Sequence, residues 1–161
     1  MENKNKLAAL AERVTKQLSD FYNGNLWVTE NLEKKIFSLS ADVTMKKVQG
    51  NTHSIAELVC HIIAWRNFGL QKLIANSAYD IEDNSAADWP LPVDWDSVRK
   101  EFDLCHHDLL NAIKSFPAEK LNATVPGRSY SFLYLINGIV EHDYYHYGQI
   151  GSVLSAIKKM E

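Results

Sequence analysis

The sequence predicts an all-α protein, specifically a four-helix bundle. Apolar residues recur at intervals of three and four along four long stretches, which is the spacing of one face of an amphipathic helix. No segment shows the sustained alternation of apolar and polar residues that is typical of a half-buried strand. Proline disrupts helix interiors, and all four prolines fall near 77–94 and 117–129, so these two segments are predicted to be loops.

The first helix is predicted over residues 6–37. Asn23-Gly24-Asn25 interrupts this stretch, and the helix is expected either to bend or to break there. A loop over 38–53, which contains Gly50, is expected to follow. The predicted inward stripe consists of Leu7, Leu10, Val14, Leu18, Phe21, Val28, Leu32 and Ile36.

The second helix has the clearest start in the sequence. Ser54-Ile55-Ala56-Glu57 fits a capping box, in which the serine accepts from the third helical amide and the glutamate reaches back to the cap. The apolar stripe that follows extends this helix to about residue 75. Its members are Ile55, Leu58, Ile62, Trp65, Phe68 and Leu73.

Two more helices complete the predicted bundle. Asp94 can cap a third helix from Trp95 to about Phe116, and a fourth runs from about Ser131 to Lys158. The 77–94 loop between the second and third helices is long enough to span the length of a helix. We therefore expect a long crossover at this point and an up-down-down-up order of helices.

Length and composition exclude several classes of protein. A chain of 161 residues is the size of one domain, predicted over 1–161. A formal charge of −3 argues against a nucleic-acid partner. The longest apolar run, 132–136, is far short of the roughly 20 residues that a membrane span needs, so no membrane association is expected. With no apolar signal core near the N-terminus, the expected location is cytoplasmic.

Three of the six histidines are predicted to face the interior. His142 and His146 are four residues apart, so they lie one above the other on the apolar face of the fourth helix. His61 lies between Leu58 and Trp65 at spacings of three and four, which places it on the inner face of the second helix. Buried imidazoles are costly unless a hydrogen-bond partner or a metal ion satisfies their nitrogens.

Two interpretations of these histidines are open. Three histidine ligands with an open fourth position are typical of a catalytic zinc site, and a ligand set without carboxylates favours zinc or nickel over magnesium, calcium or manganese. In the alternative, no metal is bound, and the imidazoles bond to carbonyls, tyrosines or the helix surface.

The other cysteines and histidines have simpler interpretations. His53 is expected at the exposed entry of the second helix, with a place at the mouth of the site as the alternative. Neighbouring helical residues point about 100° apart, so His106 and His107 cannot easily share one ion, and at least one is expected on the surface. Cys60 and Cys105 are expected to be reduced and buried, with Cys60 packing rather than acting as a ligand.

Acidic and aromatic residues surround the histidines of the fourth helix. Glu141 and Asp143 are expected on the solvated surface, and a hydrogen bond to a ligand imidazole is the alternative. The tyrosines either cover a neighbouring helix or include one that holds a bound anion or substrate; they are Tyr144, Tyr145 and Tyr147. The tryptophans are expected in the core or as loop anchors; they are Trp27, Trp65, Trp89 and Trp95.

Three segments together resemble a known family. They are 53–62 (HSIAELVCHI) with Trp65, Asp88-Trp89-Pro90 followed by Trp95, and 138–150 (GIVEHDYYHYGQI). The most specific element is H-x-x-x-H-x-G-Q-I over 142–150, matched with a histidine on the second helix. The chain resembles the DinB/YfiT-like superfamily of metal-dependent enzymes, and the likeness covers almost the whole sequence.

The resemblance implies a divalent metal, zinc or nickel, held by His61, His142 and His146, with water in the open position. It also implies an up-down-down-up bundle and a homodimer. Related proteins are thiol S-transferases or isomerases that use a low-molecular-weight thiol such as bacillithiol or mycothiol. The expected function is therefore a metal-dependent transferase or hydrolase that activates a thiol or water toward a small electrophilic substrate. The alternative is a non-catalytic, metal-stabilised bundle that binds a ligand or partner.

Overall fold

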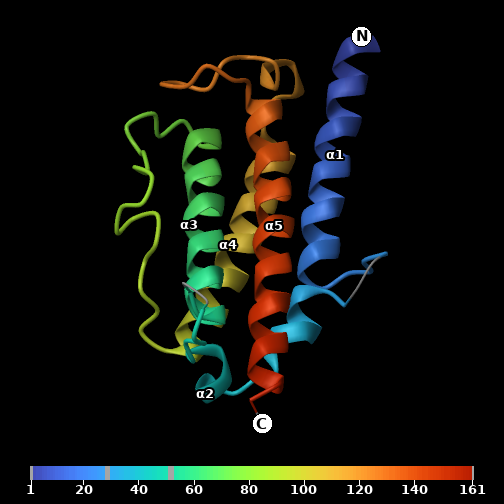
Figure 1. Cartoon of the computed structure of the whole chain (residues 1–161). Coiled ribbons are helices and arrows are strands. Elements are labelled where there is room, and N and C mark those ends of the chain that lie inside the picture. The colour runs from blue at the N-terminus through green and yellow to red at the C-terminus, as the bar shows by residue number, and fades with distance from the viewer. Residues whose placement is uncertain (1, 28–29, 51–52, 161) are drawn as a thin grey trace.

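The computed structural model describes residues 2–27, 30–50 and 53–160, and its regular structure is helical (Figure 1). Within these ranges there is no β-strand, and Thr124 and Ser131 form an isolated bridge. Four helices are long: α1 (Glu2–Tyr22), α3 (Ile55–Leu73), α4 (Trp95–Ser115) and α5 (Phe132–Lys158). None of the described helices is long and apolar enough to span a bilayer.

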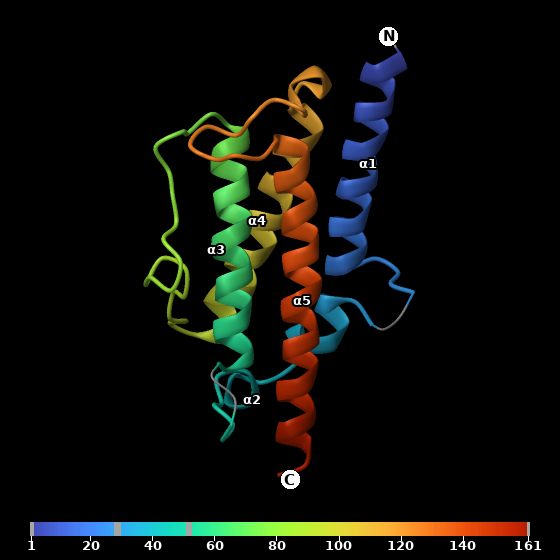
Figure 2. The ribbon, with the colours of Figure 1, turned by 45° about the horizontal axis from the view of Figure 1, so that its top comes forward.

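The four long helices close around a shared core. α3 packs against α4 and α5, and α1 packs against the same two helices. In Figure 1, α1 and α5 lead downward while α3 and α4 lead upward. The segment that joins α3 to α4 runs back along α3 in both Figure 1 and Figure 2. This return brings residues near 88 beside the middle of α3, where the histidine site lies.

The first helix ends much earlier than the predicted residue 37. α1 stops at Tyr22, and the later part of the predicted helix forms a separate π-helical turn, η1 (Glu33–Phe37). A side chain at Gly24 would bring its Cβ within 2.7 Å of the Asp20 Cα, so only glycine fits this close approach. The Gly24 carbonyl accepts from Asn31 Nδ2 at 2.8 Å, which fixes the break.

Most of the predicted inward stripe of this region is buried, with one exception. Leu10 is 40% exposed because it lies on the outer side of α1, so its predicted inward position was wrong. Val28, also predicted inward, lies outside the described residues. Trp27 is 97% exposed, so its predicted place in the core was wrong; it lies beyond Tyr22, where α1 ends.

Side-chain caps begin the other three long helices where the sequence places them. The predicted capping box at α3 is present: Ser54 Oγ accepts from the Glu57 amide at 3.2 Å, and Glu57 Oε2 accepts from the Ser54 amide at 2.7 Å. Asp94 accepts from the Ser97 amide at 2.8 Å at the start of α4. Ser131 caps α5 in the same way. These caps fix the rotational register from which the functional side chains project.

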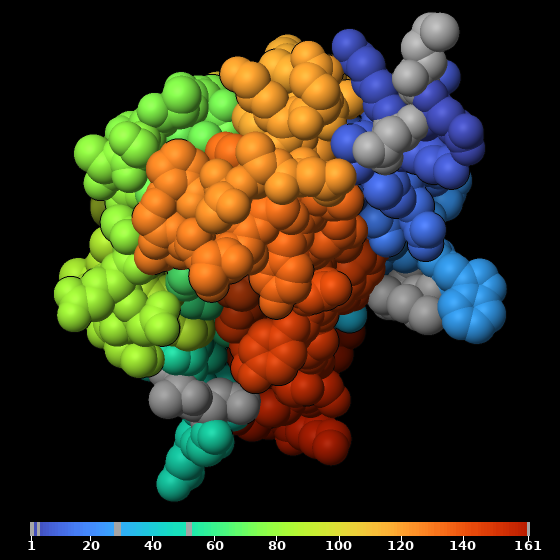
Figure 3. Space-filling view, turned by 90° about the horizontal axis from the view of Figure 1, so that it is seen from above, coloured from blue at the N-terminus to red at the C-terminus, as the bar shows by residue number. Residues whose placement is uncertain are grey.

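Two predicted loops contain short helical turns. The 38–53 segment includes α2 (Ala41–Thr44), and the 117–129 segment includes the 3₁₀ turn η2 (Ala118–Lys120). The chain that precedes α5 covers one end of the bundle, as Figure 3 shows from above. The 77–94 segment is irregular, as predicted.

Candidate metal site

The three predicted inward histidines come together between α3 and α5. His61 Nε2 lies 3.0 Å from His142 Nε2, which lies 3.0 Å from His146 Nε2. The possible ligand atoms of all three lie within 4.8 Å of one another. His61 and His146 are buried, whereas His142 is half-buried. The spacing of four residues on α5 therefore places two imidazoles opposite the one from α3.

Oxygen atoms hold the outer nitrogens of two of these rings. His61 Nδ1 lies 2.7 Å from the Asp88 carbonyl and 3.0 Å from Asp88 Oδ1. His146 Nδ1 lies 2.7 Å from Gln149 Oε1, one turn further along α5. These oxygens can only accept, so in the neutral imidazoles both Nδ1 atoms carry the proton. The Nε2 atoms of His61 and His146 then present lone pairs to the centre of the site.

The centre of the site has more lone pairs than protons. A proton on His142 Nε2 can be donated to only one of its two neighbours, which leaves the Nε2 lone pair of the other neighbour, also 3.0 Å away, without a donor. The Nδ1 atom of His142 is buried and has no hydrogen-bond partner among the described residues. A divalent cation would accept all three Nε2 lone pairs at once, so these residues fit a bound metal ion.

Burial keeps the three imidazoles uncharged. It lowers the pKa of His142 to about 3 and that of His146 to about 4, and it also lowers the pKa of His61. The neighbouring imidazoles lower the pKa of His142 further because two positive charges in one site repel. The rings are therefore neutral near pH 7, as metal ligands must be.

No fourth protein ligand joins this group within the described ranges, where its members are His61, His142 and His146. Cys60, a candidate for such a role, is buried in the apolar core, and burial raises the pKa of its thiol to about 12. Burial likewise raises the pKa of Cys105 to about 12, and its thiol faces the Ile63 carbonyl at 3.9 Å. Both cysteines are free and buried, as predicted.

The 77–94 segment supplies contacts to the site whose roles the sequence did not reveal. Besides holding His61, Asp88 accepts from Trp65 Nε1 at 2.8 Å through Oδ1 and from the Asn84 amide at 2.8 Å through Oδ2. The Trp89 ring is stacked between His53 and His61, with centroid distances of 3.7 and 3.8 Å. The motif Asp88-Trp89-Pro90 stands out in the sequence, but nothing in its spacing indicates that Asp88 contacts His61, 27 residues earlier.

Asp143 does not lie on the solvated surface, so that prediction was wrong. It is fully buried, and Asp143 Oδ2 accepts from Arg66 Nη2 at 2.7 Å and from Arg66 Nε at 3.0 Å. Arg66 Nη1 lies 3.1 Å from His106 Nδ1, and the guanidinium also lies 4.5 Å from the Phe102 ring centroid. Asp143 neighbours His142 in sequence but points to the other side of α5, so it orients no ligand imidazole.

The exposure of His106, His107 and Glu141 agrees with the predictions. His106 is buried and His107 is exposed, which agrees with the prediction that at least one lies on the surface. Burial and the nearby Arg66 charge lower the pKa of His106 to about 3. Glu141 is exposed, as predicted.

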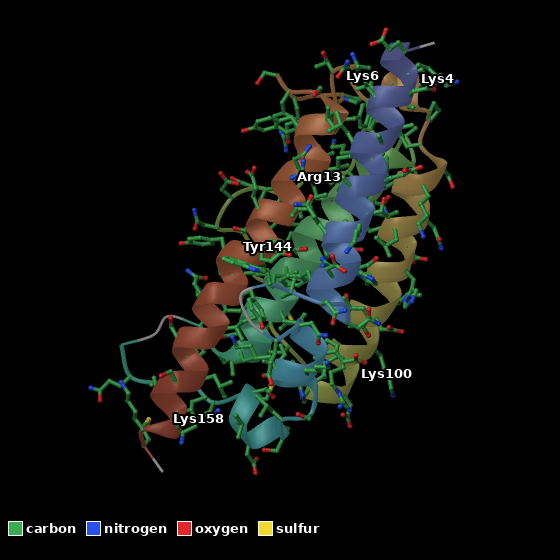
Figure 4. All side chains as sticks on the ribbon, turned by 90° about the vertical axis from the view of Figure 1, so that its right-hand side faces the viewer. Lys4, Lys6, Arg13, Lys100, Tyr144 and Lys158 are labelled. Carbon is green, nitrogen blue, oxygen red and sulfur yellow. The ribbon has the colours of Figure 1, made fainter. Side chains whose placement is uncertain are left out.

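The three tyrosines divide between two roles. Tyr144 lies on the side of α5 that faces α1 (Figure 4), where its ring packs edge-on against Phe21 at 5.4 Å. Tyr147 packs against the same phenylalanine and donates to the Glu30 carbonyl. Tyr145 instead contacts the His146 ring at 4.9 Å, and its hydroxyl accepts from Gln149 Nε2 at 3.2 Å. Only Tyr145 of the three is beside the histidine site and exposed.

The sequence matches the family model described as the DinB superfamily (DinB_2) over residues 5–150. The chain belongs to the DinB superfamily. This match confirms the resemblance inferred from the histidine motifs. No curated protein and no solved structure matched the chain. Membership of the DinB superfamily and the group of three histidines together fit a metal-binding protein.

Proposed function

We propose that the protein is a metal-dependent enzyme that transfers a low-molecular-weight thiol, or adds water, to a small electrophilic molecule. One observation carries the proposal: three neutral imidazoles direct Nε2 atoms at a common centre that no described carboxylate or thiol joins. Three nitrogen ligands with a free coordination position are the arrangement of catalytic rather than structural zinc sites.

The residues that would hold the metal are His61, His142 and His146. An all-imidazole ligand set favours zinc or nickel over the oxygen-preferring cations magnesium, calcium and manganese. When bound, such an ion acts as a Lewis acid that lowers the pKa of water or a thiol into the neutral range.

Neighbouring side chains and one backbone carbonyl orient the histidines in the absence of a metal ion. Asp88 and Gln149 hold two of the imidazoles in the tautomer that leaves Nε2 unprotonated and fix the orientation of both rings. Trp89 stacks on His61 and shields that side of the ligand ring from water. Access remains at His142, the half-buried member of the three.

The test is turnover by the zinc- and nickel-loaded chain. Thiols including bacillithiol, mycothiol and cysteine are offered with 1-chloro-2,4-dinitrobenzene, and p-nitrophenyl acetate without thiol reports hydrolysis. We expect metal-dependent turnover in one of these assays, with loss of at least about 100-fold in His142→Ala because the metal is no longer held. His107→Ala, an exposed histidine on α4, is the matched control and should retain the activity.

The same assays separate catalysis from the alternative of a metal-stabilised binding module. Stoichiometric metal that raises stability but gives no turnover with any thiol or with water would overturn the enzymatic proposal. Turnover that is equal in the wild type, in His142→Ala and in the metal-free chain would also overturn it.

A further inference from the structure

A cavity adjoins the histidine site on the side of His142. It lies between α3 and α5, has a volume of about 230 Å³, and His142 is the member of the metal group that reaches it. The other lining residues are aromatic, aliphatic or glycine: Trp65, Tyr130, Tyr134, Leu135, Gly138 and Ile139. We propose that this cavity seats an aromatic ring, without negative charge, of the electrophilic substrate. This inference rests on the proposed function.

The size and walls of the cavity match one aromatic ring with a small substituent. An apolar cavity of about 150 Å³ is enough to bind benzene, and drug-sized ligands occupy about 300–1,000 Å³. Burying a charged group against apolar walls would be costly, so the buried part of the ligand is uncharged. Ring-on-ring contacts with Trp65 and Tyr130 would add to the area buried.

The cavity wall and the metal ligand are held by the same residue. Asp88 Oδ1 accepts from Trp65 Nε1 at 2.8 Å, while the Asp88 carbonyl is 2.7 Å from His61 Nδ1. The position of the Trp65 indole is therefore tied to that of the metal site. A ring seated against Trp65 would lie beside His142, whose ring centroid is 5.8 Å from that of Trp65.

The absence of a side chain at Gly138 keeps the cavity open. A Cβ built at this position meets no atom within 4 Å, so a larger residue would extend into free space. Gly138 lies one turn before His142 on α5, and both residues line the cavity. Because glycine is unfavourable in a helix interior by about 1 kcal/mol, this open space is maintained at some cost in helix stability.

The neighbouring surface disfavours anions. Trp65 and Tyr130 also line a second, wider cavity, where three carboxylates lie with one guanidinium. Asp80 pairs with that guanidinium, which belongs to Arg128, and the other two acids are Glu82 and Asp83. An approaching anion would be repelled by this net negative charge.

The experiment is a ligand-observed ¹⁹F NMR titration of zinc-loaded and metal-free protein. The neutral probe is 4-fluorobenzyl alcohol, and the anionic probe is 4-fluorobenzenesulfonate, whose oxygens are poor metal ligands. We expect the alcohol to bind both forms and the sulfonate to bind at least about 10-fold more weakly, a difference of roughly 1.4 kcal/mol. Cobalt(II) in place of zinc should broaden the fluorine signal of the bound alcohol, because the ring lies beside the metal site.

Gly138→Leu tests the location. The leucine side chain fills the cavity, so binding of the alcohol should fall at least about 10-fold, while helix content is retained because leucine is a better helix former than glycine. Gly148→Leu is the matched control: it lies on the same helix, its Cβ also meets no atom within 4 Å, and it does not line the cavity. The control should bind the alcohol as the wild type does.

The failure of this inference is distinguishable from failure of the proposed function. One zinc per chain with no binding of the alcohol, or with equal binding by Gly138→Leu, would overturn the inference alone. Equal affinity for the two probes would overturn the assigned charge. If the chain binds no zinc, the proposed function and the substrate role both fail, and the metal-free titration still shows whether the cavity takes an aromatic ring.

Discussion

Among the described residues, α3 and α5 together supply side chains to two buried polar clusters, which differ in how their charges and lone pairs are balanced. α3 and α5 supply Arg66 and Asp143 to one cluster, in which a guanidinium meets a carboxylate. They supply His61, His142 and His146 to the other, in which three imidazoles face one another. The first cluster pairs its two charges, although Asp143 Oδ1 has no hydrogen-bond partner among the described residues. The second leaves Nε2 lone pairs without a donor and is therefore suited to a cationic ligand.

The largest expected effect concerns the histidine cluster. Alanine at His61, His142 or His146 should weaken zinc binding at least about 100-fold. The four ligands of a structural zinc site together contribute roughly 10–16 kcal/mol of binding free energy, so one ligand accounts for about a quarter of that. Zinc content by elemental analysis and helix content by circular dichroism check this. His107→Ala should retain full metal content, and unchanged zinc in all three single variants would contradict the assignment.

The charge-paired cluster of Arg66 and Asp143 should respond in stability instead of metal content. Asp143→Leu leaves the Arg66 charge buried and unpaired, and we expect a loss of about 3–5 kcal/mol in the free energy of unfolding. Arg66→Met combined with Asp143→Leu removes both charges and should recover most of that loss. Denaturant unfolding measures both. A double variant as unstable as the single one, or a folded double variant that loses zinc, would contradict the separate roles of the two clusters.

Histidines in both clusters make the metal-free protein sensitive to acid. The pKa values of His142, His146 and His106 in the folded chain are about 3, 4 and 3, against about 6.5 when unfolded. Below pH 6.5 these three histidines therefore bind more protons in the unfolded chain than in the folded chain. The metal-free protein should lose stability as the pH falls from 6.5 toward 4, by at most about 1.4 kcal/mol per pH unit for each histidine.

Zinc should protect only the first two of these histidines, because His106 lies in the other cluster. We therefore expect the acid midpoint of unfolding, followed by circular dichroism, to move to lower pH when zinc is present. An identical midpoint with and without zinc would show that the metal does not compete with protons for these rings.

The smallest expected effects come from the residues that orient the ligands. Gln149→Leu removes the acceptor of the His146 Nδ1 proton and should weaken zinc binding about 10–100-fold. Tyr145→Phe removes only the hydroxyl that accepts from Gln149 Nε2, so zinc affinity should stay within about threefold. Competition titration with a zinc chelator measures both, and a larger effect from the tyrosine would reverse the assigned roles.

Features that depend on neighbouring residues alone, such as helix caps and the face of a helix on which a residue lies, could be predicted from the sequence. The capping box at Ser54 and the cap at Asp94 set the starts of α3 and α4, and spacing alone placed His61, His142 and His146 on inner faces. The early end of α1 was foreseen only as a weak point, because the close approach at Gly24 depends on the path of the following turn.

Long-range partnerships could not be predicted in the same way. Arg66 and Asp143 are 77 residues apart in the sequence. A charged residue on an amphipathic helix is expected on the solvent-exposed face, so neither residue alone indicates a buried pair. Asp88 contacts His61 Nδ1 through its backbone carbonyl as well as its carboxylate. Every residue has a backbone carbonyl, so the residue type does not predict this contact. Trp27 has the residue type of a core anchor, and its exposure follows only from where the chain leaves the bundle.

The most direct test of the central claim is the metal content of the protein purified without an affinity tag, together with a zinc titration of the metal-free chain. If the histidine cluster is an incomplete site, one divalent ion, zinc or nickel, should be present or bind per chain. It should raise the unfolding temperature and be removed by a chelator. A chain that carries no divalent metal, takes up none, and unfolds at the same temperature with and without zinc would contradict the assignment of a metal site to the three histidines.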